Sequence, residues 1–166
     1  MTRKKYGSVA ALALLCALIT LPSSFAPAQS KAEPAKCEKP TVVDDPTYKP
    51  GQVWSYKNRP GEDASTITIL KVETTSKMGT IVHVRIDKFN LENCKGNKGD
   101  SSMDHAPFSR VAINKSVVKL LRTEKDVPDF SEGYNDWLSH CGGIYTMPVA
   151  EALTLTNKTM KDHGCN

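Results

Sequence analysis

The sequence predicts a small α+β domain in which an antiparallel sheet is followed by helices. Three observations lead to this prediction. The chain has 166 residues, which suits one domain. Alternating apolar runs come first, and helical spacing of apolar residues marks the second half. We expect a three-stranded meander with a short fourth strand, covered on one face by about three helices.

Residues 1–28 have the pattern of a secretory signal peptide. Basic residues at the start precede the apolar stretch VAALALLCALITL, and the small residues of APA then offer a cleavage point before Gln29. This stretch is shorter than the roughly 20 residues that a membrane span needs. We therefore expect export to the periplasm or out of the cell, with Cys16 removed and no membrane span remaining.

Removal of this segment changes the charge balance. The chain has 22 basic and 18 acidic residues, and three of the basic ones lie in residues 1–28, so residues 29–166 carry 19 basic and 18 acidic residues. Nucleic-acid binding depends on a concentrated positive surface. A nucleic-acid partner is therefore not expected.

Four cysteines remain after cleavage, and an even number in an exported chain predicts two disulfides. They are Cys37, Cys94, Cys141 and Cys165. Three pairings are possible, and we favour Cys94–Cys141 with Cys37–Cys165, which would join the two tails. The Cys-x-x-Cys spacing of zinc sites is absent, so no metal site is expected. No cofactor is expected either.

The strands are expected early in the domain. Residues 29–50 are rich in Lys and Pro, which favours an extended arm, and the domain is expected over residues 51–166. The runs Gln52–Lys57, Ser65–Glu73 and Thr80–Phe89 alternate apolar and polar residues between turn signals, which predicts the meander. One-sided alternation implies one covered face and one wetter face.

The helices are expected after a solvated loop over Asn90–Asp104. Apolar residues at spacings of four, seven and eight predict a helix over Ser109–Arg122, capped by Ser109. A second helix is expected over Asp129–His140, and a third over Pro148–Met160. The apolar run Ile144–Met147 predicts the short fourth strand between them.

The candidate site lies on the wetter face of the predicted meander. His83 and Arg85 belong to this face of the third strand, and Arg59 and Glu62 lie in the turn before the second. Together these four side chains offer acid–base chemistry or anion binding. The alternative is a solvated sheet face with cross-strand charge pairs. His105 is expected to orient the loop that enters the first helix.

The stretch GQVWSYKNRPGE, followed by GTIVHV, resembles a family of short uncharacterised bacterial proteins. The later pieces HAPFSRVAINKSVVKLLR and GGIYTMPVAEAL resemble the same family. The resemblance covers about residues 50–155. It implies no catalytic residues that can be transferred to this chain.

These features favour an exported, disulfide-stabilised binding module over an enzyme. Nucleophile elbows, zinc-protease motifs and dinucleotide fingerprints are absent from the sequence. The expected partner is a protein, for example a toxin or hydrolase that the chain neutralises, or a component of the envelope. One alternative is a small hydrolase that uses His83 with Glu62, and another is a carrier of a small ligand.

Overall fold

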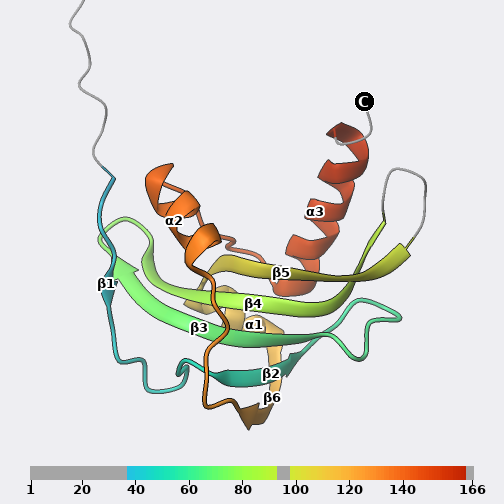
Figure 1. Cartoon of the computed structure of the whole chain (residues 1–166), viewed down its shortest axis with the longest axis horizontal. Helices are drawn as coiled ribbons and strands as arrows, with labels where there is room; N and C mark the ends of the chain where they lie inside the picture. Colours follow the sequence, from blue (N-terminus) through green and yellow to red (C-terminus); the bar gives the residue numbers. More distant parts are fainter. Residues whose placement is uncertain (1–36, 93–97, 164–166) are drawn as a thin grey trace, which may run out of the picture. The chain divides into compact units, whose positions relative to one another are not determined.

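An antiparallel sheet forms the centre of the fold, and the α+β class predicted from the sequence is confirmed. The computed structural model describes residues 37–92 and 98–163, and within these ranges it contains six strands and three helices. Figure 1 shows their arrangement. The expected signal peptide lies outside the described residues. In the described part of the chain, we find no helix with the length and apolar character of a membrane span.

The meander expected from the alternating runs is present and lies inside a larger sheet. The strands β1 (Thr41–Val42), β2 (Gln52–Tyr56), β3 (Thr66–Thr75), β4 (Gly79–Glu92), β5 (Lys98–Ser109) and β6 (Val117–Thr123) pair antiparallel in the order β5-β4-β3-β2-β6, and β1 pairs with β3. Much of the loop expected over Asn90–Asp104 is therefore strand. The polar residues of this segment suit an edge strand, because one side of β5 forms backbone hydrogen bonds with β4 and none of the other described strands pairs with its other side.

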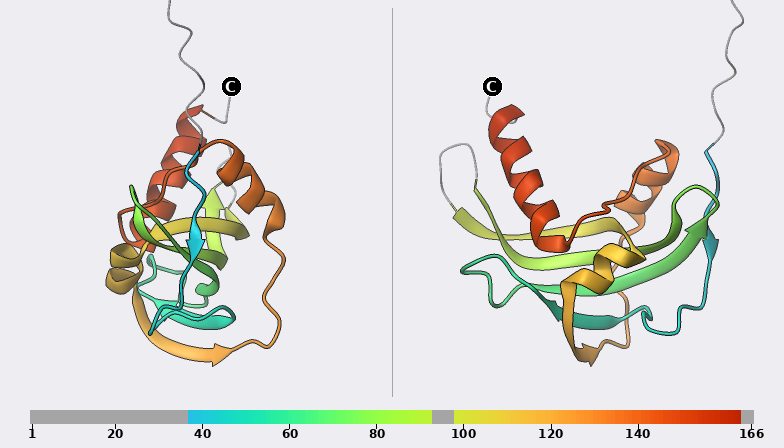
Figure 2. Two further views of the ribbon diagram at one scale, coloured as in Figure 1. Left: turned by 90° about the vertical axis from the view of Figure 1, so that its left-hand side faces the viewer. Right: turned by 180° about the vertical axis from the view of Figure 1, so that it is seen from behind.

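Helices cover both faces of the sheet, and the expectation of one covered face is wrong. The helices are α1 (Arg110–Ser116), α2 (Ser131–Ser139) and α3 (Val149–His163). Side chains of α1 and α3 join the apolar core with the strand face that carries Val82, Val84 and Ile86. Figure 2 shows α2 on the opposite side of the sheet. The face expected to be wet is therefore covered as well.

The first predicted helix ends after two turns. Ser109 caps it as expected, because its hydroxyl accepts a hydrogen bond from the backbone of Ala112. From Val117 onward the chain is strand β6, paired with the edge of β2. The β-branched pair Val117 and Val118 disfavours helix, and a free sheet edge offers backbone partners in its place.

The other predicted helices are confirmed, and the predicted fourth strand is not. Helix α2 lies within Asp129–His140, and α3 begins directly after Pro148. In the run Ile144–Met147, Tyr145 forms an isolated bridge to Phe108. This single bridge ties the connection between α2 and α3 to the end of β5.

Residues 37–50, which were expected to be an extended arm, lie against the domain. Tyr48 is buried in the core, and Nε of Arg110 donates to the carboxylate of Asp45. Burial would raise the pKa of Asp45, but Arg110 and two backbone amides lower it to about 2. This segment therefore contributes a strand and an ion pair to the domain.

The disulfide joins this segment to the end of α2. Cys37 is bonded to Cys141, 104 residues further along the chain, with a Cα–Cα distance of 5.1 Å. Both pairings favoured from the sequence are therefore wrong, because α2 brings Cys141 beside the start of the described chain. Cys94 and Cys165 lie outside the described residues.

Candidate binding site

A chain of polar side chains runs across three strands beneath α2. Glu73 on β3 and His83 on β4 are only 1% and 0% exposed. Nε2 of His83 lies 3.2 Å from Oε2 of Glu73, and Nδ1 of His83 lies 2.9 Å from Nε2 of His105 on β5. The chain thus leads from the buried carboxylate of Glu73 through the buried imidazole of His83 to the half-buried imidazole of His105.

Two further groups hold the carboxylate of Glu73. Nζ of Lys71 lies 2.6 Å from Oε1 of Glu73, in an ion pair along β3. The hydroxyl of Tyr134 on α2 donates to Oε2 of Glu73 at 2.9 Å, and Lys71 lies over the Tyr134 ring. A buried carboxylate needs such partners, because an isolated charge in the interior is strongly unfavourable.

Helix α2 covers this chain with a stripe of aromatic side chains. Phe130, Tyr134 and Trp137 follow helical spacing and so share one side of α2. The ring centroids of Tyr134 and Trp137 lie 5.4 and 5.0 Å from that of His83, and the ring of Phe130 lies 6.2 Å from His105. The stripe explains why His83, expected on the wetter face, is buried.

Two glycines allow α2 to lie this close. A Cβ at Gly133 would stand 2.8 Å from the Cβ of His105, and a Cβ at Gly142 would stand 2.1 Å from Cδ1 of Trp137. Neither distance is tolerated by real side chains. Glycine at both positions is therefore needed for the aromatic stripe to reach the histidines.

Burial keeps both histidines uncharged at neutral pH. It lowers the pKa of His83 to about 3, and repulsion from His105 and Lys71 acts in the same direction. Burial also lowers the pKa of His105, against the attraction of Glu73. Each ring therefore has one nitrogen that donates and one that accepts.

The position of the Glu73 carboxylate determines which nitrogen of each imidazole carries the proton. A proton on Nε2 of His83 avoids repulsion from Glu73, although these two groups do not form a hydrogen bond. Nδ1 of His83 then accepts from Nε2 of His105. Among the described residues, Nδ1 of His105 has no hydrogen-bond partner, and it is left as an acceptor.

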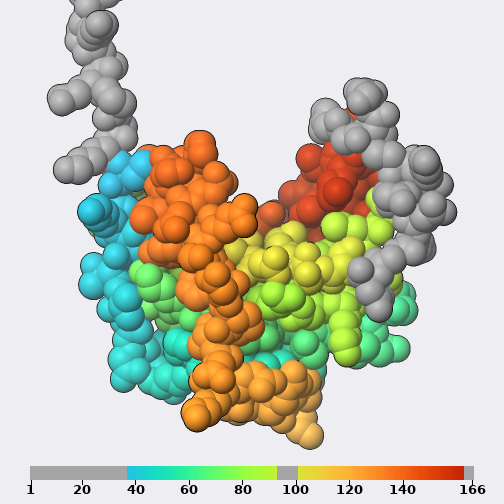
Figure 3. Space-filling model, viewed as in Figure 1, coloured from blue at the N-terminus to red at the C-terminus, as the bar shows by residue number. Residues whose placement is uncertain are grey.

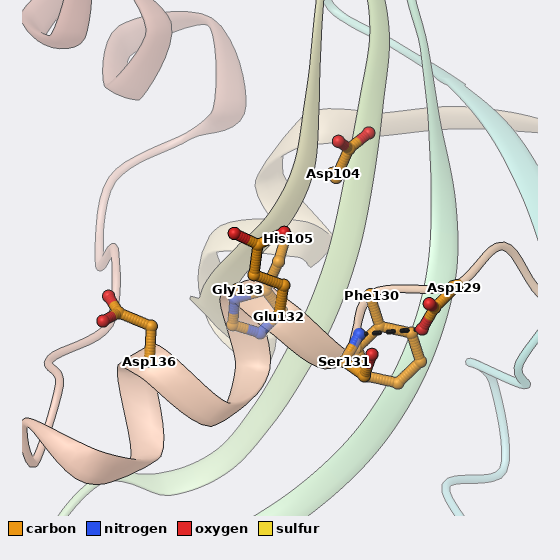
Figure 4. A pocket seen from close by; sticks show the side chains of 8 residues that line it. All are labelled: Asp104, His105, Asp129, Phe130, Ser131, Glu132, Gly133 and Asp136. Atoms are coloured by element: carbon orange, nitrogen blue, oxygen red, sulfur yellow. Dashed lines mark hydrogen bonds between the residues drawn. The ribbon is translucent and has the colours of Figure 1, made fainter.

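His105 lines a surface pocket of about 480 Å³ between β5 and the start of α2. Four carboxylates, those of Asp104, Asp129, Glu132 and Asp136, and the ring of Phe130 also line it (Figure 4). Asp104 is paired with Arg85, and Asp129 accepts from the backbone of Ser131. A pocket with this lining favours a positively charged group that carries N–H donors.

The structure divides the four predicted site residues among three places. Arg59 and Glu62 form an ion pair near the far end of β4, where Glu62 accepts from the backbone of Asn90. His83 lies seven residues before Asn90, about 23 Å along an extended strand. Arg85 pairs with Asp87 and Asp104 beside the pocket. A joint site of His83 and Glu62 is therefore not formed.

Sequence reasoning missed Glu73 and underestimated His105. Glu73 closes a β-branched run and has the appearance of a polar strand end, and no motif marks it. The sequence did contain one relevant signal, the stripe of Phe130, Tyr134 and Trp137. A helix with three aromatic side chains on one side is expected to pack against another surface of the protein. The sequence does not say which strand face that surface is.

Comparison of the chain with the profiles of known protein families, with curated proteins and with solved structures found no match. The site is therefore interpreted from its own geometry. Among the residues that the structure describes, no cluster of three or more His, Cys, Asp or Glu side chains is arranged to hold a metal ion.

We expect acid to destabilise the fold through the two histidines. Below the ordinary histidine pKa of 6.5 the unfolded chain binds protons at His83 and His105, whereas the folded chain resists them. The free energy of unfolding should therefore fall as the pH drops from 6.5 toward 4, by up to about 1.4 kcal/mol per pH unit for His83, and His105 should add to the fall in the same direction. Urea unfolding across this range measures the slope.

The variant His83→Gln should reduce that slope, because one of the two buried imidazoles is removed. The exposed Asn135 on α2 is the control, because it carries no titrating group, and Asn135→Gln should leave the slope as in the parent protein. A slope that His83→Gln does not change would show that other groups cause the acid sensitivity.

Proposed function

We propose that this chain is an exported, non-enzymatic binding protein that holds a protein partner at the pocket between β5 and α2. The observation that carries the proposal is His105, an uncharged imidazole with an open acceptor nitrogen, in a pocket lined by four carboxylates. Such a lining complements the basic side chains of a protein surface. The Cys37–Cys141 disulfide supports an oxidising compartment.

Binding accounts for this arrangement better than catalysis does. A general base works best when its pKa lies near the working pH, and burial lowers the pKa of His105. The hydrolase alternative required His83 and Glu62 in one site, and these residues have different partners. The carrier alternative required an apolar cavity between the sheet and the helices, and this pocket is open at the surface and lined by four carboxylates.

The proposal is tested by affinity capture with the full chain, exported and oxidised, on envelope and culture fractions. We expect one stoichiometric protein partner that is released by salt, as a charge-based contact requires. A bait with Glu132→Gln and Asp136→Asn should lose this partner. The matched control, Glu124→Gln at the end of β6, removes an exposed carboxylate elsewhere and should retain it.

Acetylation of the partner's lysines then tests the chemistry of the contact, and it should weaken binding at least tenfold. A partner that the pocket variant retains would place the binding surface elsewhere. The absence of any partner from both fractions would contradict the proposed function.

A further inference from the structure

Helix α2 lies at the periphery of the domain. None of its residues is buried, and Phe130 at its start provides no side-chain cap. The residues before it, 124–127, are exposed, and Cys141 and Gly143 after it are exposed as well. Figure 3 shows α2 as a ridge separated from α3 by a notch. Few contacts other than those with the histidine chain hold it in place.

The surface that α2 covers is polar. Its aromatic stripe lies on Glu73, His83 and His105, and the Tyr134 hydroxyl donates to Glu73 and accepts from Lys71. Burial of such polar groups stabilises the position of α2 less than burial of an apolar face would, because each polar group loses its hydrogen bonds with water. The covalent bond from Cys141 to Cys37 is therefore a major restraint on the helix.

That bond anchors α2 to the sheet through β1. Cys37 lies four residues before β1, and β1 pairs with β3 at Thr41–Thr74 and Val42–Glu73. Cys141 is exposed, and its φ of 48° ends the helix in the usual left-handed turn, in which the backbone of Gly142 donates to the carbonyl of Trp137. The disulfide thus joins the end of α2 to the segment that continues into β1 and the sheet.

We propose that α2 is a flap closed by the Cys37–Cys141 disulfide, and that reduction of this bond by a protein dithiol opens it. The dithiol supplies two electrons and two protons and becomes a disulfide, while Cys37 and Cys141 become thiols. Opening exposes the Glu73–His83–His105 chain and removes one wall of the pocket. This inference does not depend on the partner proposed above, because it concerns the position of α2 alone.

Opening should also change how the two histidines titrate. Lys71 and Glu73 face them from β3, Tyr134 faces them from α2, and Asp104 adjoins His105 on β5. In the closed state, burial is the main cause of the lowered pKa of both rings. In water the rings regain their hydration, so the pH midpoint of the His83 NMR signals should rise by at least one unit, and that of His105 should rise as well.

Hydrogen exchange tests the flap. The full chain with Cys94→Ala and Cys165→Ala retains only the cysteines of the described bond after signal removal, so that a dithiol reductant acts on this bond alone. We expect the amides of α2 to exchange at least tenfold faster after reduction, while those of β3 and β4 change less than twofold. Equal acceleration in α2 and the sheet would indicate general destabilisation and would overturn the proposal, as would unchanged exchange in α2.

Two variants separate the effect of the bond from that of stability. Cys37→Ser with Cys141→Ser should show the fast exchange of α2 without reductant. Arg110→Ala breaks a different side-chain anchor of the N-terminal segment, the ion pair with Asp45, and keeps the disulfide, so it should leave the exchange of α2 unchanged. If Arg110→Ala accelerates α2 as strongly as the cysteine variant, the disulfide is not the closing element.

Discussion

Replacing Glu73 by alanine should lower the free energy of unfolding by about 3–5 kcal/mol. The change removes the acceptor of the Tyr134 hydroxyl and the partner of the Lys71 ammonium, and both groups lie at the covered interface. It also leaves a cavity beside His83. Loss of one member of a buried charged network costs more than its net contribution, because the remaining groups lack partners.

Urea unfolding measures this effect, and Glu73→Gln separates charge from hydrogen bonding. The amide oxygen retains an acceptor for Tyr134 and fills the space, so we expect about half the loss or less. Glu132→Ala, an exposed carboxylate on α2, is the control and should remain within about 0.5 kcal/mol of the parent. A loss below about 1 kcal/mol in Glu73→Ala would show that the polar chain does not hold α2 on the sheet.

The sequence predicts well those elements whose residues obey a single periodicity. The meander of β2, β3 and β4 follows from alternation of β-branched residues, and α3 follows from helical spacing after Pro148. The cap at Ser109 follows from the local chemistry of a helix start. In each case the information lies within one segment of the chain.

The prediction was wrong where the same residues fit both a helical and a strand periodicity. It was also wrong where a segment distant in the sequence determines whether a residue is buried or with which residue it pairs. Val117 and Leu120 fit the helix that begins at α1, yet they form strand β6 because the edge of β2 offers backbone partners. His83 alternates like an exposed strand residue, and only the position of α2 decides that it is buried. The Cys37–Cys141 pairing likewise depends on where α2 ends.

The candidate site was predictable only in part for the same reason. His83 was identified from its place in a strand, but its partners Glu73 and His105 come from the two neighbouring strands. Pairing across strands cannot be assigned until the register is known. The role of Arg59, Glu62, His83 and Arg85 in binding stays a prediction.

The ion pair of Arg59 and Glu62 provides the second large effect. Glu62 has a side chain that is 3% exposed, and it receives two hydrogen bonds from Arg59 and one from the backbone of Asn90. Arg59 also donates to the carbonyl of Asn90 at 2.6 Å. The pair therefore fixes the loop before β3 to the far end of β4.

Replacing Arg59 by alanine should cost about 3–5 kcal/mol of unfolding free energy, because it leaves the Glu62 carboxylate buried with one backbone donor. The double variant Arg59→Ala, Glu62→Ala removes both charges and should cost less than the sum of the single changes, with a coupling of about 2–3 kcal/mol. Arg59→Lys retains the charge but not the paired hydrogen bonds, and an intermediate loss is expected.

Urea unfolding and partner capture on the same variants decide what this pair does. If the pair is structural, stability falls in Arg59→Ala, and the captured partner is retained wherever the protein remains folded. If Arg59 instead contacts the partner, as its place in the polar turn first indicated, capture is lost while stability changes by less than about 1 kcal/mol. The burial of Glu62 favours the first result, because a carboxylate so enclosed would lose the side-chain cation that neutralises it if Arg59 turned toward a partner.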